Sequence, residues 1–124
     1  MRPQGMNWNR RDKRCAIYAR DEFRCVFCGA EPDQMQLDHL TPISEGGTND
    51  EDNLVTCCNA CNEAKGEQCF DAYCRQLEAR GTNVRRLRQR VAQSTFVPID
   101  RALGKRLEAR RTRGSFSSLR RIAA

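Results

Sequence analysis

Aromatic residues make up only 6% of this 124-residue sequence and hydrophobic residues 39%, whereas charged residues account for 31%. Such a composition leaves little apolar material for a large core, so another interaction is expected to help hold the fold together. The length allows one domain with an appendage. The sequence also contains a single histidine, His39, and its neighbours decide what that histidine can do.

No apolar run reaches the roughly 18 residues that a membrane helix needs. The first 15 residues also lack the apolar centre of a signal peptide. We therefore expect an intracellular, cytoplasmic protein with no membrane partner. In a reducing compartment, paired cysteines bind metal more often than they form disulfides.

The net charge of +6 conceals an asymmetry along the chain. Residues 1–74 carry 8 Lys and Arg against 13 Asp and Glu, whereas residues 75–124 carry 14 against 3. A strongly basic half favours a polyanionic partner, most simply nucleic acid. The alternative interpretation is a solvated, partly disordered tail.

Hydrophobic periodicity and turn residues outline the secondary structure. The expected elements are a helix over 9–20, short strands over 37–40 and 53–57, a helical stretch from about residue 59 that stops at Gly81, a second helix over 83–93 and a third over about 100–113. The two strands are expected to form a hairpin with a long, irregular connection, because Pro42 and Gly46-Gly47 interrupt the segment between them. The serine-rich end over 114–124 is expected to be disordered or to fold on a partner.

Two CxxC pairs, Cys25–Cys28 and Cys58–Cys61, have the spacing of a four-thiolate zinc site. A redox dithiol or two disulfides are the alternatives, but nothing else in the chain resembles a redox fold. Cys57 could compete with Cys58 as a ligand, although Cys58 gives the CxxC register and alternation along a strand directs Cys57 to the core. The remaining cysteines are expected to be small buried hydrophobes: Cys15, Cys69 and Cys74.

Because four thiolates complete a zinc shell, His39 is not needed as a zinc ligand. Asp38 is its neighbour, and Asn62 directly follows the last paired cysteine. Both side chains offer hard oxygen ligands that suit Mg²⁺ or Mn²⁺. Asn53 begins the strand expected to pair with the strand that carries Asp38 and His39. A histidine suits general-base chemistry near neutral pH, whereas a lone histidine without these neighbours is more often structural.

Together these features resemble the HNH endonuclease family, the ββα-metal or His-Me finger nucleases, in its zinc-binding subtype. The resemblance covers about residues 15–66 and depends on the order and spacing of its parts. These parts are Cys25-x-x-Cys28, Asp38-His39, Pro42, Gly46-Gly47, Asn53-Leu54, Cys58-x-x-Cys61-Asn62 and Lys65-Gly66. Asn62 stands where the family name has its last histidine, and an amide oxygen can still bind Mg²⁺.

The resemblance implies the α+β fold class, with a small ββα-metal hairpin–helix core and a structural four-cysteine zinc site. An N-terminal helix and basic C-terminal helices would flank this core. The implied domains are an N-terminal arm over 1–14, an HNH nuclease domain over 15–81, and a basic helical extension over 82–124 with a partly disordered tail.

The resemblance also implies a bacterial or phage-encoded, metal-dependent endonuclease that hydrolyses DNA. His39 would be the general base, Asn53 would orient it, and Asp38 and Asn62 would hold one Mg²⁺ or Mn²⁺ against the scissile phosphate. A homodimer and a phage-packaging or other protein partner are left open. The competing interpretation is a non-catalytic, zinc-stabilised DNA- or RNA-binding module.

Basic residues outside the cysteine pairs are candidate phosphate contacts. Lys65 is expected either to touch a backbone phosphate or to be solvated. The other candidates are Arg85, Arg86, Arg88, Arg90, Arg106 and Arg110. No base-reading module is recognisable, so the sequence predicts no target site.

Overall fold

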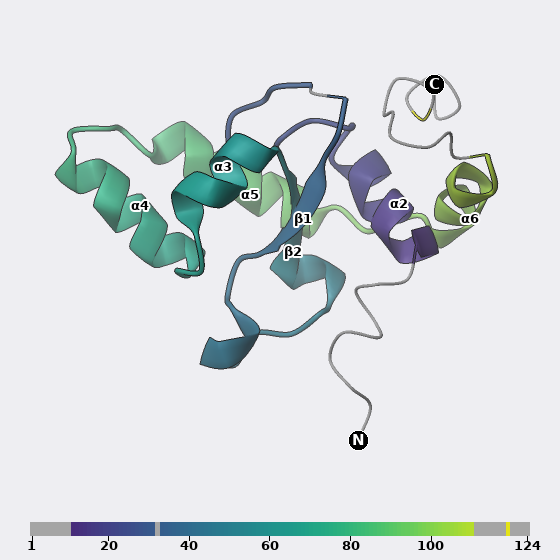
Figure 1. Ribbon diagram of the computed structural model, residues 1–124, viewed down its shortest axis with the longest axis horizontal. Helices are drawn as coiled ribbons and strands as arrows, with labels where there is room; N and C mark the ends of the chain where they lie inside the picture. Colours follow the sequence, from purple (N-terminus) through teal and green to yellow (C-terminus); the bar gives the residue numbers. More distant parts are fainter. Residues whose placement is uncertain (1–10, 32, 111–118, 120–124) are drawn as a thin grey trace.

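The computed structural model describes residues 11–31, 33–110 and Leu119 (Figure 1). Its elements follow in the order α2 (Arg11–Arg20), β1 (Gln36–His39), the short 3-10 helices η1 (Ile43–Glu45) and η2 (Glu51–Asn53), β2 (Leu54–Cys57), α3 (Asn59–Lys65), α4 (Phe70–Ala79), α5 (Arg85–Phe96) and α6 (Arg101–Ala109). The expected strands and the other helices have counterparts here, with ends shifted by a few residues. The helical stretch expected from about residue 59 to Gly81 is instead two helices, α3 and α4, because the chain leaves the helical conformation at Gly66, whose φ is 62°. The serine-rich end lies outside the described residues, apart from Leu119.

Strands β1 and β2 form a two-stranded antiparallel sheet in which Gln36 pairs with Cys57 and His39 pairs with Leu54. Helix α3 starts directly after Cys58 and packs back against β1. The hairpin and α3 therefore form a ββα unit, and helices lie on both sides of it (Figure 1). This arrangement confirms the predicted α+β class.

A buried polar network fixes α2 and α5 to the hairpin. The side chains of Arg20 and Asp21 are fully buried and form an ion pair at 3.0 Å. Asp21 accepts hydrogen bonds from the Thr56 backbone N–H at 3.0 Å and from the Ser94 hydroxyl at 2.6 Å. Arg20 also donates to the Leu54 carbonyl at 2.7 Å. Because every partner is supplied, these charges can be buried beside the apolar residues of β2.

Helix α6 packs along α2, although the two lie at opposite ends of the described chain (Figure 1). Gly104 allows this close approach, since a Cβ there would lie 2.2 Å from the Asp12 carbonyl oxygen and 2.9 Å from Ala16 Cβ. Packing of this kind adds apolar contact that the small hairpin alone could not provide. None of the helices among the described residues has the length and apolar character needed to cross a bilayer.

Helix α4 begins at a cysteine cap. The sulfur of Cys69 accepts the Ala72 backbone N–H at 3.4 Å, and its side chain is partly exposed. The prediction that Cys69 is a buried hydrophobe is therefore wrong, because a side chain that caps a helix start must reach the exposed first turn. Cys15, Cys57 and Cys74 are fully buried, as predicted.

Candidate metal centre and active-site pocket

The four paired cysteines converge from two segments. Cys25 and Cys28 lie in the turn between α2 and β1, Cys58 precedes α3, and Cys61 lies in its first turn. Their four sulfur atoms lie within 4.8 Å of one another, and the Sγ atoms of Cys28 and Cys58 are 3.9 Å apart. Four sulfurs at this spacing are placed to bind one metal ion, and an all-thiolate set is consistent with zinc.

The surroundings of these thiols shift their pKa values. Burial raises the pKa of the Cys25 and Cys61 thiols, and the charge of Cys25 raises that of Cys61 further. Burial also opposes ionisation of Cys58, but hydrogen bonds from Cys61 and the neighbouring thiols outweigh it and lower the Cys58 pKa. Four thiolates this close together would repel one another, and a cation bound between them would remove that repulsion.

Hydrogen bonds from three segments of the chain hold the turn that carries Cys25 and Cys28. The Cys25 backbone N–H donates to the Ala30 carbonyl at 2.9 Å, and the Val26 N–H donates to the Thr56 carbonyl at 2.9 Å. Arg90 of α5 donates to the carbonyls of Val26 at 3.0 Å and Phe27 at 2.5 Å. The basic C-terminal extension thus supports the turn that carries two of the metal-binding sulfurs.

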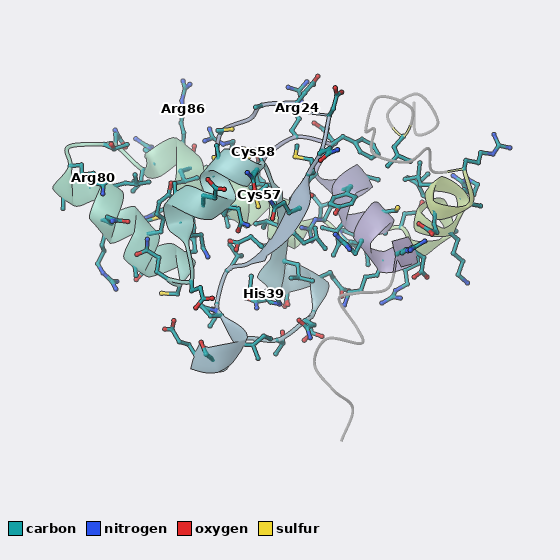
Figure 2. All side chains as sticks on the ribbon, in the orientation of Figure 1. Arg24, His39, Cys57, Cys58, Arg80 and Arg86 are labelled. Carbon is teal, nitrogen blue, oxygen red and sulfur yellow. The ribbon has the colours of Figure 1, made fainter. Side chains whose placement is uncertain are left out.

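A second candidate site lies at the other end of the hairpin, where Figure 2 shows His39 well away from Cys57 and Cys58. An open cavity of about 500 Å³ is lined there by Asp38, His39, Asn62 and Lys65, among others. Asp38 and His39 share this cavity although they are adjacent, because His39 is the last residue of β1 and strand alternation ends there.

Asp38 is buried beside a buried lysine. The Lys65 ammonium lies 2.9 Å from Asp38 Oδ2 and donates to the His39 carbonyl oxygen at 3.0 Å. Burial raises the pKa of the Asp38 carboxyl above its ordinary value, and the contact with Lys65 offsets part of that rise. Oδ2 is fully buried and faces this ammonium, so an ion held by Asp38 would need its other carboxylate oxygen.

The ring of His39 contacts a loop residue. Its Nε2 lies 2.7 Å from Oδ1 of Asn49, and Asn49 is buried. The backbone carbonyl of Asn49 accepts a hydrogen bond from the ammonium of Lys13 in α2 at 2.5 Å. The sequence did not reveal these two residues, because Thr48-Asn49-Asp50 has the composition of an ordinary turn and a lysine in a basic helix suggests a solvated side chain.

Asn53 shapes the connection between the strands. Its side chain accepts from the Thr41 N–H at 2.9 Å and donates to the carbonyls of Thr41 at 2.9 Å and Thr48 at 2.8 Å. These three bonds close the loop that begins after His39 and carries Asn49. Any orienting effect of Asn53 on His39 would therefore act through the loop backbone.

The loop glycines meet two different steric demands. Gly46 has a φ of 90°, a conformation that most side chains disfavour. A Cβ on Gly47 would lie 1.8 Å from the Thr41 carbonyl oxygen. This pair serves loop geometry, as its composition suggested.

Asn62 lies in α3, one residue after the metal-cluster cysteine Cys61. Its Nδ2 donates to Oε1 of Gln36 at 2.8 Å, and Gln36 donates to Asn59 at 2.6 Å. This contact uses the amide nitrogen. The Oδ1 of Asn62 has no hydrogen-bond donor within the part of the chain that the structure describes, so it can face a cation. Gln36 is another residue that the sequence alone did not single out.

The candidate phosphate contacts separate into two groups. Arg85, Arg86, Arg106 and Arg110 are exposed, as contact with a polyanion requires. Arg88 forms an ion pair with Asp71 at 3.1 Å, and Arg90 is committed to the carbonyls described above.

Lys65 differs from all of these candidates. The alternative that it is solvated is wrong, since it is 2% exposed. Its ammonium pairs with Asp38, and its contact with a backbone phosphate stays a prediction.

Comparison with known proteins agrees with this geometry. The family model described as HNH endonuclease matches residues 25–68, the segment that contains both cysteine pairs and the cavity residues. The chain is also 30% identical over 69 residues to the CRISPR-associated endonuclease Cas9 of Corynebacterium diphtheriae. That alignment covers 53% of this chain and 6% of the Corynebacterium protein. No solved structure matches the chain significantly.

Proposed function

Because residues 25–68 carry an HNH endonuclease domain, we propose that the chain is a metal-dependent endonuclease that hydrolyses DNA phosphodiester bonds. The observation that supports this most directly is that Asp38, His39 and Asn62 line one open cavity. A carboxylate and an amide oxygen can hold one hard cation, and an imidazole can accept a proton from a water molecule. A site for binding alone would not need the imidazole.

In the proposed reaction, His39 accepts a proton from a water molecule. The resulting hydroxide donates an electron pair to phosphorus, the bond from phosphorus to the 3′-oxygen breaks, and its electron pair leaves on that oxygen. The products are a 5′-phosphate and a 3′-hydroxyl once the leaving oxygen takes up a proton from solvent. A Mg²⁺ or Mn²⁺ ion bound by Asp38 and Asn62 would supply positive charge beside the phosphate.

The cysteine cluster has a structural part in this proposal. Zinc bound by Cys25, Cys28, Cys58 and Cys61 would join the turn before β1 to the start of α3. Since Asn62 directly follows Cys61, the same cluster fixes the position of one proposed ligand of the catalytic ion. Structural zinc sites often supply much of the folding free energy of small domains.

DNA is the proposed partner because of the charge distribution. Residues 75–124 carry 14 basic against 3 acidic residues, and the exposed arginines of α5 and α6 belong to this half. Contacts of this kind bind phosphates without reading bases, and their affinity falls steeply with salt.

The test is nicking of supercoiled plasmid by wild type and His39→Ala in Mg²⁺ and in EDTA, with zinc content measured for each protein. We expect Mg²⁺-dependent nicking that falls by about 10²–10⁴-fold in His39→Ala while zinc is retained. Asp38→Asn should also lose activity. Asp52→Asn, which removes an exposed carboxylate from the loop, should not.

A different result would favour the competing function. If wild type and His39→Ala both fail to cut, yet bind DNA or RNA with a steep salt dependence, the protein is a zinc-stabilised binding module without catalysis. Equal nicking by both proteins would point to a contaminating nuclease and would contradict the role of His39.

A further inference from the structure

We infer that Asn49 is a positioning residue that fixes the tautomer and the orientation of His39, and that Lys13 of α2 holds Asn49 in place. This inference rests on the proposed function, because it assigns how the proposed base is prepared for its task. The observation behind it is the contact of 2.7 Å between Asn49 Oδ1 and His39 Nε2. Asn49 is only 4% exposed, so water does not readily replace it as the partner of the ring.

The chemistry of the contact determines where the ring proton lies. An amide oxygen can only accept a hydrogen bond, so a neutral imidazole facing it must carry its proton on Nε2. The unprotonated nitrogen of the neutral ring is then Nδ1. Nδ1 is therefore the atom that accepts the proton from water, and Nε2–H remains bonded to Asn49 throughout. Fixing one tautomer and one ring plane removes unproductive states of the base.

The support of Asn49 comes from outside the matched segment. Lys13 lies in α2, before residue 25, and its ammonium donates to the Asn49 carbonyl at 2.5 Å. Lys13 is 4% exposed, and Glu51 lies 3.9 Å from its ammonium. A buried charge with these partners holds the loop backbone at one point. The N-terminal helix thus contributes to the proposed active site through a lysine–asparagine–histidine chain.

Asn49 and Asn53 have separable roles in this arrangement. Asn53 bonds to the backbone of Thr41 and Thr48 and closes the loop. Asn49 uses that closed loop to present its amide oxygen to the ring. Removing Asn53 should therefore disturb the whole loop, whereas a conservative change at Asn49 should alter the contact with His39 and leave the loop closed.

The single histidine makes a direct test practical. In protein labelled with ¹⁵N-histidine, one imidazole gives one pair of ring nitrogen signals, and their shifts report the tautomer. At about pH 8, where ordinary imidazoles are neutral, wild type should show the Nε2–H tautomer as the dominant form. Asn49→Ala should lose that dominance, Asn49→Asp should retain it because the carboxylate still accepts, and Asp52→Asn is the matched control.

Kinetics supply the second readout. Asn49→Ala should lower kcat for plasmid nicking by about 10–100-fold with little change in KM, since the contact acts on the base and not on DNA. Asn49→Asp should recover most of that loss. Lys13→Met should lower kcat in the same sense by a smaller factor, with zinc content and the thermal melting curve showing that the fold is kept.

The outcomes separate this inference from the proposed function. A wild-type ring protonated on Nδ1, or a tautomer unchanged in Asn49→Ala, would overturn the positioning role even in an active enzyme. A wild-type protein that never cuts but shows the Nε2–H tautomer, lost in Asn49→Ala, would refute the endonuclease and uphold the contact. If Asn49→Ala does not fold, Asn49→Asp decides the question, because loss of the Nε2–H form in that variant contradicts the inference.

Discussion

The ammonium of Lys65 lies 2.9 Å from Oδ2 of Asp38, and these two side chains are 1% and 10% exposed. The same ammonium donates to the carbonyl of His39, so one buried cation contacts both residues at the end of β1. A lysine this deeply buried needs its partner, and so does the aspartate. The pair therefore connects α3 to the end of the hairpin that carries His39.

Replacing Lys65 with methionine should destabilise the metal-free protein by about 3–5 kcal/mol, because an uncompensated carboxylate remains in a buried site. Lys105→Met, which changes an exposed lysine of α6, should alter the free energy of unfolding by less than about 0.5 kcal/mol. Urea unfolding in EDTA and without added Mg²⁺ gives both values, provided zinc content is equal. Similar small losses in the two variants would show that Asp38 does not depend on Lys65.

The pH dependence of this loss follows from the direction of the Asp38 shift. Burial raises its pKa in the folded protein, so the folded state binds the proton more tightly than the unfolded state. The resulting contribution to stability is present below the unfolded pKa of about 4 and is lost as pH rises through the folded pKa. In Lys65→Met the folded pKa should rise further, since an opposite charge is gone.

Measured in EDTA, the free energy of unfolding of Lys65→Met should therefore fall more steeply than that of wild type as pH rises above about 4. The double variant Asp38→Asn/Lys65→Met should lack this extra slope. Parallel curves for wild type and Lys65→Met would rule out the carboxylate as the titrating group.

The sequence predicted the parts of this molecule that depend on local spacing. The two CxxC pairs, the Asp38–His39 pair and the alternation of short strands and helices require only neighbours along the chain. The structure confirms the cysteine cluster, the hairpin and the helices. These features were predictable because metal-ligand spacing and helical periodicity are properties of a continuous segment.

The surroundings of the site were not predictable in the same way. Lys65 ends a short polar helix and Lys13 lies in a basic one, so each pattern suggests a solvated side chain. Each is buried because a segment distant in the sequence covers it. Strand β1 covers Lys65, and the loop around Asn49 covers Lys13. Its residue type suggests a buried core position for Cys69, yet its sulfur caps α4. Long-range packing decides such cases, and residue type alone does not.

Zinc binding should release protons and strengthen as pH rises. The raised pKa values of Cys25 and Cys61 mean that these thiols keep their protons in the metal-free protein near neutral pH, and zinc binds thiolates. Each proton displaced should raise the apparent zinc affinity about tenfold per pH unit. Chelator competition between about pH 6.5 and 8 measures the slope, and a flat profile would show that the thiols are already ionised.

Cysteine variants identify the ligands independently. Cys28→Ser should lose most bound zinc and unfold at a lower temperature, because one sulfur of the cluster is removed. Cys69→Ser is the matched control, since a serine oxygen can still cap α4. It should retain about one zinc per chain. Equal zinc loss in both variants would place the metal elsewhere.

Gln36 offers a test of how Asn62 is oriented toward a cation. Its Oε1 accepts the Asn62 amide nitrogen at 2.8 Å, which turns the amide oxygen of Asn62 away from Gln36. Gln36→Leu should free that amide to rotate and weaken Mn²⁺ binding by about 10–100-fold, as loss of a partner that orients a ligand typically does. Gln34→Leu, at an exposed position two residues earlier, should leave the affinity unchanged.

Mn²⁺ binding can be followed by electron paramagnetic resonance without DNA and without turnover, so the result does not depend on activity. Asn62→Leu should weaken the same binding at least as much while leaving it measurable through Asp38, and the double variant with Gln36→Leu should show no additional loss, because Gln36 acts only through Asn62. An additional loss in the double variant would mean that Gln36 supports the pocket by another route. Unaltered Mn²⁺ affinity in Asn62→Leu would remove Asn62 from the proposed ligand set.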